Sequence, residues 1–155
     1  MKLYYAIGVA ISPFMMVVFW VYNRLSGVVR PRVLVMNAAG EVLLVRSWTG
    51  HQGWELPGGG KSRRETAEDA ARREVKEELG LDLAGWLLVN VGAVTANGYV
   101  APIFKAVLNE RVPITRNKWE LSGAAWYSVS NLPAYLGPAA RWAFENDVQK
   151  TNDLL

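Results

Sequence analysis

The segment from residue 58 to residue 80 constrains this chain more than any other, because it joins a glycine run to a sharply bounded helix. Thr66 suits the N-cap position, with Asp69 three residues later, and Gly80 stands where a left-handed residue often follows the last helical turn. We therefore expect a helix over residues 66–79. Any fold of the chain must place this loop and this helix together.

Three glutamates share one face of that helix. Glu74, Glu77 and Glu78 stand three and four positions apart, within an arc of about 100°. Carboxylates this close repel one another by about 0.2–0.5 kcal/mol for each pair, so a compensating cation is expected. Oxygen ligands without histidine or cysteine suit Mg2+, Mn2+ or Ca2+ better than zinc. The pattern alone also fits a solvated acidic face.

The glycine run before the helix offers backbone groups to a ligand. In LPGGGKSRRE, consecutive glycines permit positive φ and leave amides and carbonyls free. The next positions are basic, with Lys61, Arg63 and Arg64 close to seven acidic residues between positions 65 and 82. These cations either bind additional phosphates or offset the nearby acids, and the sequence leaves both interpretations open.

The size and composition of the chain exclude several other classes. With 155 residues, about half of them hydrophobic, it is long enough for one globular domain and short for two. The absence of cysteine excludes disulfide scaffolds, thiolate zinc sites and cysteine nucleophiles. Of the 17 basic residues only Lys2 precedes Arg24, so the remaining chain carries 16 basic and 14 acidic residues. That balance is a poor match to duplex nucleic acid, which we do not expect as a partner.

The first 25 residues form a separate segment, and the expected domain occupies residues 26–155. Residues 3–22 carry no charge, and a bilayer-spanning helix needs about 20 residues. We therefore predict a hydrophobic helix that anchors the chain in an inner or plasma membrane. Arg24, Arg30 and Arg32 follow it, which favours a cytoplasmic location for the domain. The alternatives are a helix packed on its own domain or a partner, in a cytoplasmic protein, and a cleaved signal peptide.

Outside these segments the sequence alternates strands with turns. Residues 33–36 and 42–45 predict a β-hairpin around a turn at 37–40. Further strands are expected at residues 86–94, 99–108 and 124–129, and a last helix starts at Pro138 and runs through Phe144. This order indicates a mixed α/β or α+β sandwich, with helices covering a largely mixed sheet. The order of the strands does not follow from the sequence.

The loop and helix together resemble a known family signature. Gly59, five residues, Glu65, seven residues and then the run REVKEELGL from Arg73 to Leu81 are similar to the complete Nudix box of the Nudix hydrolases. The likeness extends over about 120 residues and leaves the first 25 outside. It implies a Nudix-type α/β/α sandwich, preceded here by the hydrophobic segment. It also implies a Mg2+- or Mn2+-dependent enzyme that hydrolyses a phosphoanhydride bond in a nucleoside diphosphate linked to another group. Many members dimerise, so the resemblance allows a homodimer.

The resemblance assigns roles position by position. Glu74, Glu77 and Glu78 would hold the divalent metal, with the Gly58 carbonyl as a further ligand. Such metals neutralise charge that develops on a diphosphate and lower the pKa of bound water, while a carboxylate removes a proton as water attacks phosphorus. Glu74 and Glu77 therefore count among the candidate catalytic residues.

Other residues of the signature would support or complete this site. Glu65 is expected within reach of Arg73, so that their ion pair braces the loop that starts at Gly59. Glu120 is the candidate general base, because it lies six residues before Trp126 in a stretch similar to the family's glutamate-containing loop. An exposed loop glutamate is the alternative. The basic residues before Glu65 depart from the acidic residue and glycine that many members carry there.

Aromatic residues and one histidine complete the candidates for substrate binding. Trp48 and Trp119 lie in loop-like contexts and could stack on a nucleobase, although tryptophans more often belong to a core. His51, the only histidine, is expected to be exposed. The expected substrate is a nucleotide-type small molecule. A non-catalytic nucleotide-sensing or scaffolding module at the membrane is the rival function, and the intact signature favours the enzyme.

Overall fold

The computed structural model describes residues 28–49 and 53–148 of the chain. The predicted hydrophobic helix at residues 3–22 and His51 lie outside these residues. Among the described residues, no helix is both long enough and apolar enough to cross a membrane. The membrane anchor therefore stays a prediction.

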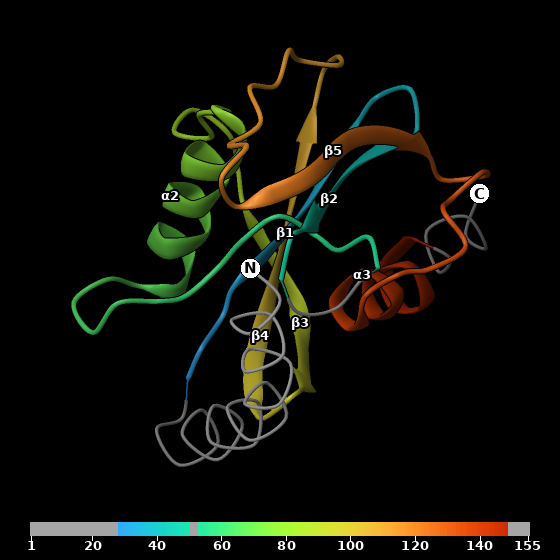
Figure 1. Cartoon of the computed structure of the whole chain (residues 1–155). Helices are drawn as coiled ribbons and strands as arrows, with labels where there is room; N and C mark the ends of the chain where they lie inside the picture. The colour runs from blue at the N-terminus through green and yellow to red at the C-terminus, as the bar shows by residue number, and fades with distance from the viewer. Residues whose placement is uncertain (1–27, 50–52, 149–155) are drawn as a thin grey trace, which may run out of the picture.

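Five strands form one mixed sheet in the described part of the chain (Figure 1). They are β1 (Arg32–Asn37), β2 (Glu41–Ser47), β3 (Val89–Ala96), β4 (Tyr99–Leu108) and β5 (Leu121–Ser128). Their spatial order is β3-β4-β1-β2-β5; β1 runs parallel to β4, and the other neighbours are antiparallel. The chain thus crosses the sheet between β2 and β3, and this crossing contains the glycine loop and the acidic helix.

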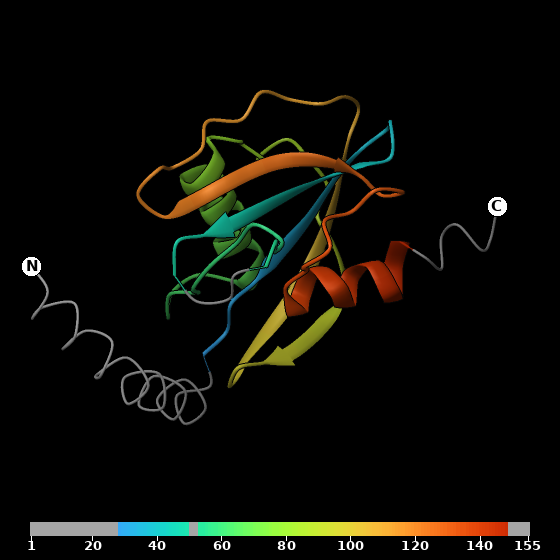
Figure 2. The ribbon, with the colours of Figure 1, turned by 45° about the vertical axis from the view of Figure 1, so that its right-hand side comes forward.

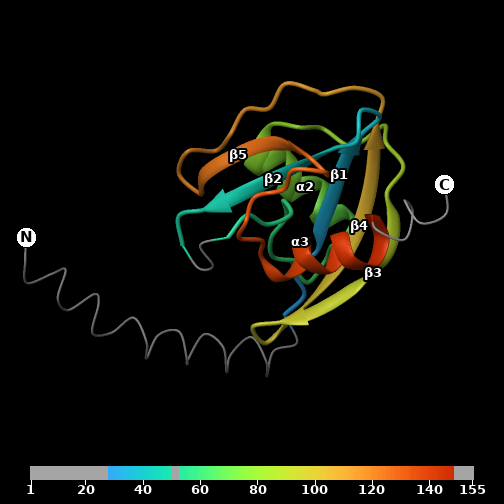
Figure 3. The ribbon, with the colours of Figure 1, turned by 90° about the vertical axis from the view of Figure 1, so that its right-hand side faces the viewer.

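Two helical segments cover the two faces of the sheet. α2 (Ala67–Leu79) lies on one face, and α3 (Pro138–Ala143), which continues as a π-helical turn η1 (Phe144–Val148), lies on the other. Figure 3 shows α3 in front of the sheet and α2 behind it. The expected α/β/α sandwich with a mixed sheet is confirmed.

Strand β1 is buried on both faces, as a central strand of such a sandwich must be. Val33 and Val35 belong to the core under α2, together with Val75. Leu34, between them, belongs to the core under α3, together with Ala140. The continuous apolar run in the sequence reflects this double burial.

The predicted start of β3 is wrong, whereas the β1–β2 hairpin and β4 lie where expected. β3 begins at Val89 instead of residue 86. Trp86 lies in a turn, where its amide donates to the Leu83 carbonyl (3.0 Å) and its own carbonyl accepts from the Arg72 guanidinium (3.0 Å). Arg72 thus holds the start of the apolar run beside α2, and the strand begins only after it.

Smaller differences occur at β5 and at the last helix. β5 begins at Leu121, three residues before the predicted start, because β2 pairs with it as far as Ser47. The last helix begins at Pro138 as predicted. Its α-helical geometry ends at Ala143, and Phe144 opens the π-helical turn.

Candidate active site

Both ends of α2 are fixed by the local contacts that the sequence predicts. Thr66 Oγ1 accepts a hydrogen bond from the Asp69 amide (3.0 Å), and the Thr66 amide donates to the Asp69 carboxylate (3.4 Å). At the other end Gly80 adopts φ +66°, and its amide donates to the Lys76 carbonyl (2.9 Å). These contacts fix the two ends of the helix. Val75 is buried against the sheet, and Glu74 and Glu78 reach the glycine loop.

The glycine loop is held against the start of β1. Arg32 Nη1 donates to the carbonyls of Leu56 (3.3 Å) and Gly58, and the Val33 amide donates to the Pro57 carbonyl (2.9 Å). Gly58 has φ +136°, and a side chain there would overlap the backbone just before β1. Only glycine fits this conformation and this contact.

Gly59 leaves room for the carboxylate of Glu74. A Cβ atom at residue 59 would overlap the carboxylate oxygens of Glu74, and that side chain is only 15% exposed. The Glu74 carboxylate occupies the space that a Cβ atom at residue 59 would need, so a larger residue there would displace this carboxylate.

Glu78 is the most buried of the three predicted metal ligands, with 8% exposure. Its Oε2 accepts a hydrogen bond from the Gly58 amide (2.9 Å), which joins the helix to the loop. Burial raises the pKa of Glu78 to about 7, and the Gly58 hydrogen bond and the Arg32 charge oppose this shift only in part. An approaching cation would favour the ionised carboxylate and reverse the shift.

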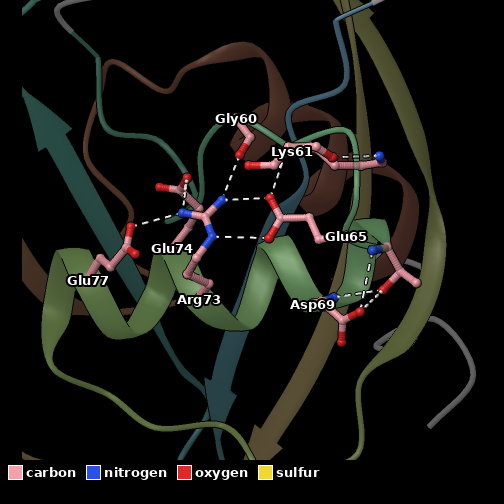
Figure 4. Close-up of polar contacts among 9 residues, drawn as sticks. Gly60, Lys61, Glu65, Asp69, Arg73, Glu74 and Glu77 are labelled. Carbon is pink, nitrogen blue, oxygen red and sulfur yellow. Dashed lines mark hydrogen bonds and ion pairs between the residues drawn. The ribbon is translucent and has the colours of Figure 1, made fainter.

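Arg73 lies among the other carboxylates, as Figure 4 shows. Its Nη1 donates to Glu74 (2.8 Å) and to Glu77 (2.9 Å). Its Nε and Nη2 donate to the two oxygens of Glu65 (3.1 and 2.9 Å), and Nη2 also donates to the Gly60 carbonyl (2.9 Å). The expected ion pair with Glu65 is present, and Arg73 also bridges two predicted metal ligands.

Glu65 ties the basic loop to the helix. Besides Arg73, its carboxylate accepts a hydrogen bond from the Ser62 amide (2.6 Å). The Arg73 hydrogen bonds, followed by that amide, lower the pKa of Glu65 to about 2. The same contacts with Glu65 raise the pKa of Arg73 above its ordinary value. Both partners of this brace are therefore charged at neutral pH.

The three glutamates predicted as metal ligands are not gathered into one group. Among the described residues, no three His, Cys, Asp or Glu side chains are placed to hold a metal ion together. Arg73 lies between Glu74 and Glu77, and Glu78 is turned to a backbone amide. The donor chemistry still fits Mg2+ or Mn2+, because all the donors are oxygens and two carboxylates already converge on one cationic nitrogen. A divalent cation would need Arg73 Nη1 to give up that position.

The connection between β4 and β5, which ends with Glu120, passes close to α2 (Figure 2). Its backbone contacts the C-terminal end of α2, where the Asn117 amide donates to the Glu78 carbonyl (2.8 Å). Glu120 accepts a hydrogen bond from the Asn117 side chain (3.1 Å). Its negative charge is one of the smaller causes of the raised Glu78 pKa, so the two carboxylates lie within electrostatic range.

The remaining candidates lie on the surface around the loop and the strand ends. Arg63 and Arg64 are exposed, and Lys61 Nζ donates to the Ser62 carbonyl (3.0 Å). Trp48 and Trp119 are 61% and 94% exposed, so neither belongs to the core. Four of the five candidates are thus exposed, and Lys61 is half-buried.

Arg32 is the contact residue at this site that the sequence did not reveal. It holds the Gly58 carbonyl, which was expected to serve as a metal ligand. A carbonyl oxygen has two lone pairs, so this bond does not by itself exclude a second contact. The signal available in the sequence was a charged residue between a proline and an apolar strand, and the partner of such a residue 26 positions away is not encoded locally.

The fold and the site define a class: an α/β/α sandwich in which a glycine loop and a glutamate-bearing helix lie together on one face of a mixed sheet. The NUDIX domain model matches residues 28–147. The chain therefore belongs to the Nudix hydrolase family.

Two solved structures illustrate the likeness. The MutT NUDIX hydrolase from Burkholderia pseudomallei is 31% identical, with 76% of this chain and 98% of that chain covered and a TM-score of 0.60. The MutT protein from Methanosarcina mazei Go1 is 21% identical, with 80% and 94% covered and a TM-score of 0.64. The second likeness is one of fold alone.

Two curated relatives match shorter stretches. An RNA pyrophosphohydrolase from Marinomonas sp. (strain MWYL1) is 46% identical over 55 residues, which is 34% of this chain and 34% of that protein. The putative 8-oxo-dGTP diphosphatase 3 from Mycobacterium tuberculosis is 38% identical over 109 residues, which is 63% of this chain and 49% of that protein. The alignments thus span from about a third to about half of the length of these relatives.

Proposed function

We propose that this protein is a Mg2+- or Mn2+-dependent hydrolase that cleaves a phosphoanhydride bond in a nucleoside diphosphate linked to another group. The observation that carries the proposal is the convergence of Glu74 and Glu77 on one cationic nitrogen beside the glycine loop. Membership of the Nudix family supports it. So do the two curated relatives, since the name of each describes cleavage of a phosphate chain.

Glu74, Glu77 and Glu78 would hold the metal, and the Gly58 carbonyl would join them through its second lone pair. The bound ion would supply neutralisation of diphosphate charge and a lowered pKa for bound water. The contribution of the chain is to hold the carboxylates beside the loop. Gly59 allows that approach, and Glu78 anchors it through the Gly58 amide.

Arg73 and Glu65 act in this proposal as positioning residues. Arg73 balances the charge of Glu74 and Glu77 until a metal takes its place. Its other nitrogens stay bound to Glu65 and to the Gly60 carbonyl, so the loop keeps its position during the exchange. The cost of three neighbouring carboxylates is thereby offset in both states.

Glu120 would remove the proton from the attacking water. Support comes from its exposure, its position on the connection that contacts α2, and its electrostatic coupling to Glu78. Glu120→Gln should lower kcat while leaving Mn2+ affinity unchanged. A parallel loss of Mn2+ affinity would make Glu120 a ligand and not a base.

Lys61, Arg63 and Arg64 would contact the phosphates of the substrate. They follow the glycine loop directly, and the side chains of Arg63 and Arg64 are exposed. Basic groups at such an edge attract polyanions from solution. The substrate class that fits is a small molecule of the nucleotide type.

The test measures phosphate release by the full-length chain from nucleoside triphosphates, sugar nucleotides, dinucleoside polyphosphates and capped RNA, with and without Mg2+. Glu77→Gln should reduce kcat/KM by about 100-fold or more, because metal stabilisation of the transition state amounts to several kcal/mol. Glu145→Gln is the matched control, an exposed glutamate in η1 on the opposite face. Nucleotide binding without turnover in the wild-type protein would replace the enzyme by a sensing or scaffolding module.

Residues 3–22 are proposed to anchor the domain to an inner or plasma membrane, with the domain on the cytoplasmic side. The support is their length and lack of charge. Ala10→Arg combined with Ile11→Arg should move the protein from the membrane fraction to the soluble fraction, because each arginine near the centre of the run costs about 2.5–3.5 kcal/mol on insertion. Ser26→Arg, outside the uncharged run, should leave it with the membranes. Sedimentation of the same protein tests the homodimer.

A further inference from the structure

Two tryptophans lie exposed on neighbouring segments at the end of β2. Trp119 is 94% exposed and Trp48 is 61% exposed. Backbone and side chain join their segments: the Trp48 amide donates to the Glu120 carbonyl (3.2 Å), and Trp48 Nε1 donates to the Lys118 carbonyl (3.0 Å). Trp48 is therefore bonded to the residues on both sides of Trp119.

The backbone that carries these rings is fixed by hydrogen bonds. The Trp119 amide donates to the Asn117 side-chain oxygen (3.1 Å), and the Leu121 amide donates to the Asn117 carbonyl (3.0 Å). Ser47 Oγ donates to the Glu120 carbonyl (3.2 Å). The turn at residues 117–121 thus presents Trp119 from a held backbone, and an aromatic side chain with two rotatable bonds loses little entropy on binding.

Exposure of both rings needs a reason, because other tryptophans of this chain are used for packing. Trp54 makes an edge contact with Tyr127 (5.0 Å between ring centroids) and lies against Gly123. Trp48 has already satisfied its only polar side-chain atom, so only its ring faces and edges are left for further contact. Large exposed aromatic surfaces of this kind mark binding sites more often than scattered aliphatic residues do.

The turn is attached directly to the candidate active site. The Asn117 amide donates to the carbonyl of Glu78, the residue whose side chain holds the Gly58 amide (2.8 and 2.9 Å). Two positions further along the chain stands Trp119. A ligand could therefore place its phosphates at the glycine loop and its ring at this turn, since Glu78 is hydrogen-bonded to both segments.

Three cations lie around the turn, and the Glu120 carboxylate next to Trp119 offsets part of their charge. Arg116 donates to the carbonyls of Leu121 (3.0 Å) and Ser122, and Arg46 donates to the Ser122 hydroxyl (3.2 Å). Lys118 precedes Trp119 directly. Aromatic faces bordered by cations are the combination that binds unpaired bases joined to phosphates.

We propose that Trp48 and Trp119 form a base-stacking platform that binds the nucleobase of the substrate. The ligand chemistry is an unpaired base joined to a 5′ chain of phosphates, which occurs in free nucleoside triphosphates and at the 5′ end of single-stranded RNA. The inference rests on the proposed function for the reaction that follows binding. The platform itself is tested by binding alone.

The experiment measures binding to the full-length protein in the presence of a chelator, so that no hydrolysis occurs. The probes are GTP, a 5′-triphosphorylated single-stranded RNA decamer and inorganic tripolyphosphate, which lacks a base. Trp119→Ala should weaken GTP binding by about 5- to 150-fold, the effect of one lost base–aromatic stack. Trp119→Phe should restore most of it. Binding of tripolyphosphate should be unchanged in both variants.

Matched controls separate stacking from folding. Leu87→Ala removes a side chain that is 78% exposed before β3, at the opposite edge of the sheet from β5, and should leave all three probes unaffected. Thermal unfolding of Trp119→Ala should match that of the wild-type protein, because the side chain makes little contact with the core. Equal loss of GTP and tripolyphosphate, or no loss of either, overturns the proposal.

Comparison of the probes also distinguishes a free nucleotide from an RNA end, and it separates failure of the platform from failure of the proposed hydrolase function. A larger loss for the RNA decamer than for GTP assigns the platform to RNA ends, a larger loss for GTP assigns it to free nucleotides, and equal losses show that it binds the base from either source. Base-dependent binding without any Mg2+-dependent hydrolysis removes the proposed function and keeps the platform. Hydrolysis with a GTP KM that Trp119→Ala does not change removes the platform and keeps the proposed function.

Discussion

At two places in this protein, one on each face of the sheet, a glycine lies in close contact with the carboxylate of a glutamate. In the loop before α2, Gly59 makes room for the carboxylate of Glu74. At the start of α3, Gly137 makes room for the carboxylate of Glu55. At both places a Cβ atom would overlap the carboxylate group. The local device is the same, and the partners of the two carboxylates differ.

Glu55 is bound by backbone amides, whereas Glu74 is bound by a side chain. Glu55 accepts hydrogen bonds from the amides of Leu56 (2.9 Å), Ala139 (3.2 Å) and Ala140 (2.6 Å). The Ala139 and Ala140 amides cannot leave without unfolding the start of α3. Glu74 shares the Arg73 guanidinium with a second carboxylate, and a long side chain can move aside. The contact between Glu55 and the start of α3 is therefore a fixed part of the fold. At α2, in contrast, another cation can take the place of the Arg73 guanidinium beside Glu74.

Glu78 gives the largest expected effect on the α2 side. Its pKa of about 7, against an ordinary value of 4.5, means that the folded protein keeps a proton that the unfolded chain loses between these pH values. The free energy of unfolding therefore falls as the pH rises from 4.5 to 7 and stays low above it. In chelator-treated protein, Glu78→Gln should be more stable than wild type by about 3 kcal/mol at pH 8, and the difference should shrink toward pH 4.5.

Urea unfolding at pH 4.5, 6 and 8 measures this difference. Glu77→Gln removes the same charge from the exposed side of the helix and should change stability by no more than about 1 kcal/mol at any pH. A Glu78→Gln variant that is less stable than wild type at pH 8 would show that the buried carboxylate is already satisfied, like Glu55. The contrast between the two faces would then be lost.

Glu55→Gln should have the opposite sign. A glutamine can place only one oxygen among the three amides, so its NH2 group must face at least one backbone donor. Leaving such a buried donor without a partner costs about 1–3 kcal/mol. Urea unfolding should show this loss at pH 8, and Mn2+ affinity of the folded protein should be unchanged. Destabilisation with a parallel loss of Mn2+ affinity would instead place Glu55 in the functional site.

The contacts that the sequence predicted are local ones. The Thr66–Asp69 capping box and the left-handed Gly80 depend on residues within one helix. The ion pair between Glu65 and Arg73 spans eight positions and joins neighbouring elements. Each of these has a sequence signal in the types and spacing of the residues involved.

The contacts that the sequence did not predict join distant segments. Arg32 reaches Gly58 across 26 positions, and Glu55 reaches Ala140 across 85. Both join segments that lie far apart in the sequence, and no local pattern encodes such a pairing. The predicted start of β3 is wrong for a related reason: Arg72, which lies on α2, donates to the carbonyl of Trp86 and holds it outside the strand.

Substitution of the two glycines tests the comparison between Glu74 and Glu55 most directly, with the smallest expected effect. Gly137 has φ −70°, and Gly59 is not among the glycines with positive φ, so alanine fits both backbones and only the added Cβ matters. Gly59→Ala should push the Glu74 carboxylate from its place and weaken Mn2+ binding by about tenfold, the lower end of the effect of disturbing ligand support. Gly137→Ala should displace Glu55 from its amides and lower stability without changing Mn2+ affinity.

Calorimetric titration of Mn2+ and urea unfolding, applied to both variants, separate these outcomes. One glycine should affect the cation and the other the fold, because a guanidinium can yield its position to a metal and a backbone amide cannot. Two variants that both lose stability and both keep wild-type Mn2+ affinity would mean that Glu74 is as structural as Glu55. The carboxylates of α2 would then serve only in structural ion pairs, and the metal would have to bind elsewhere.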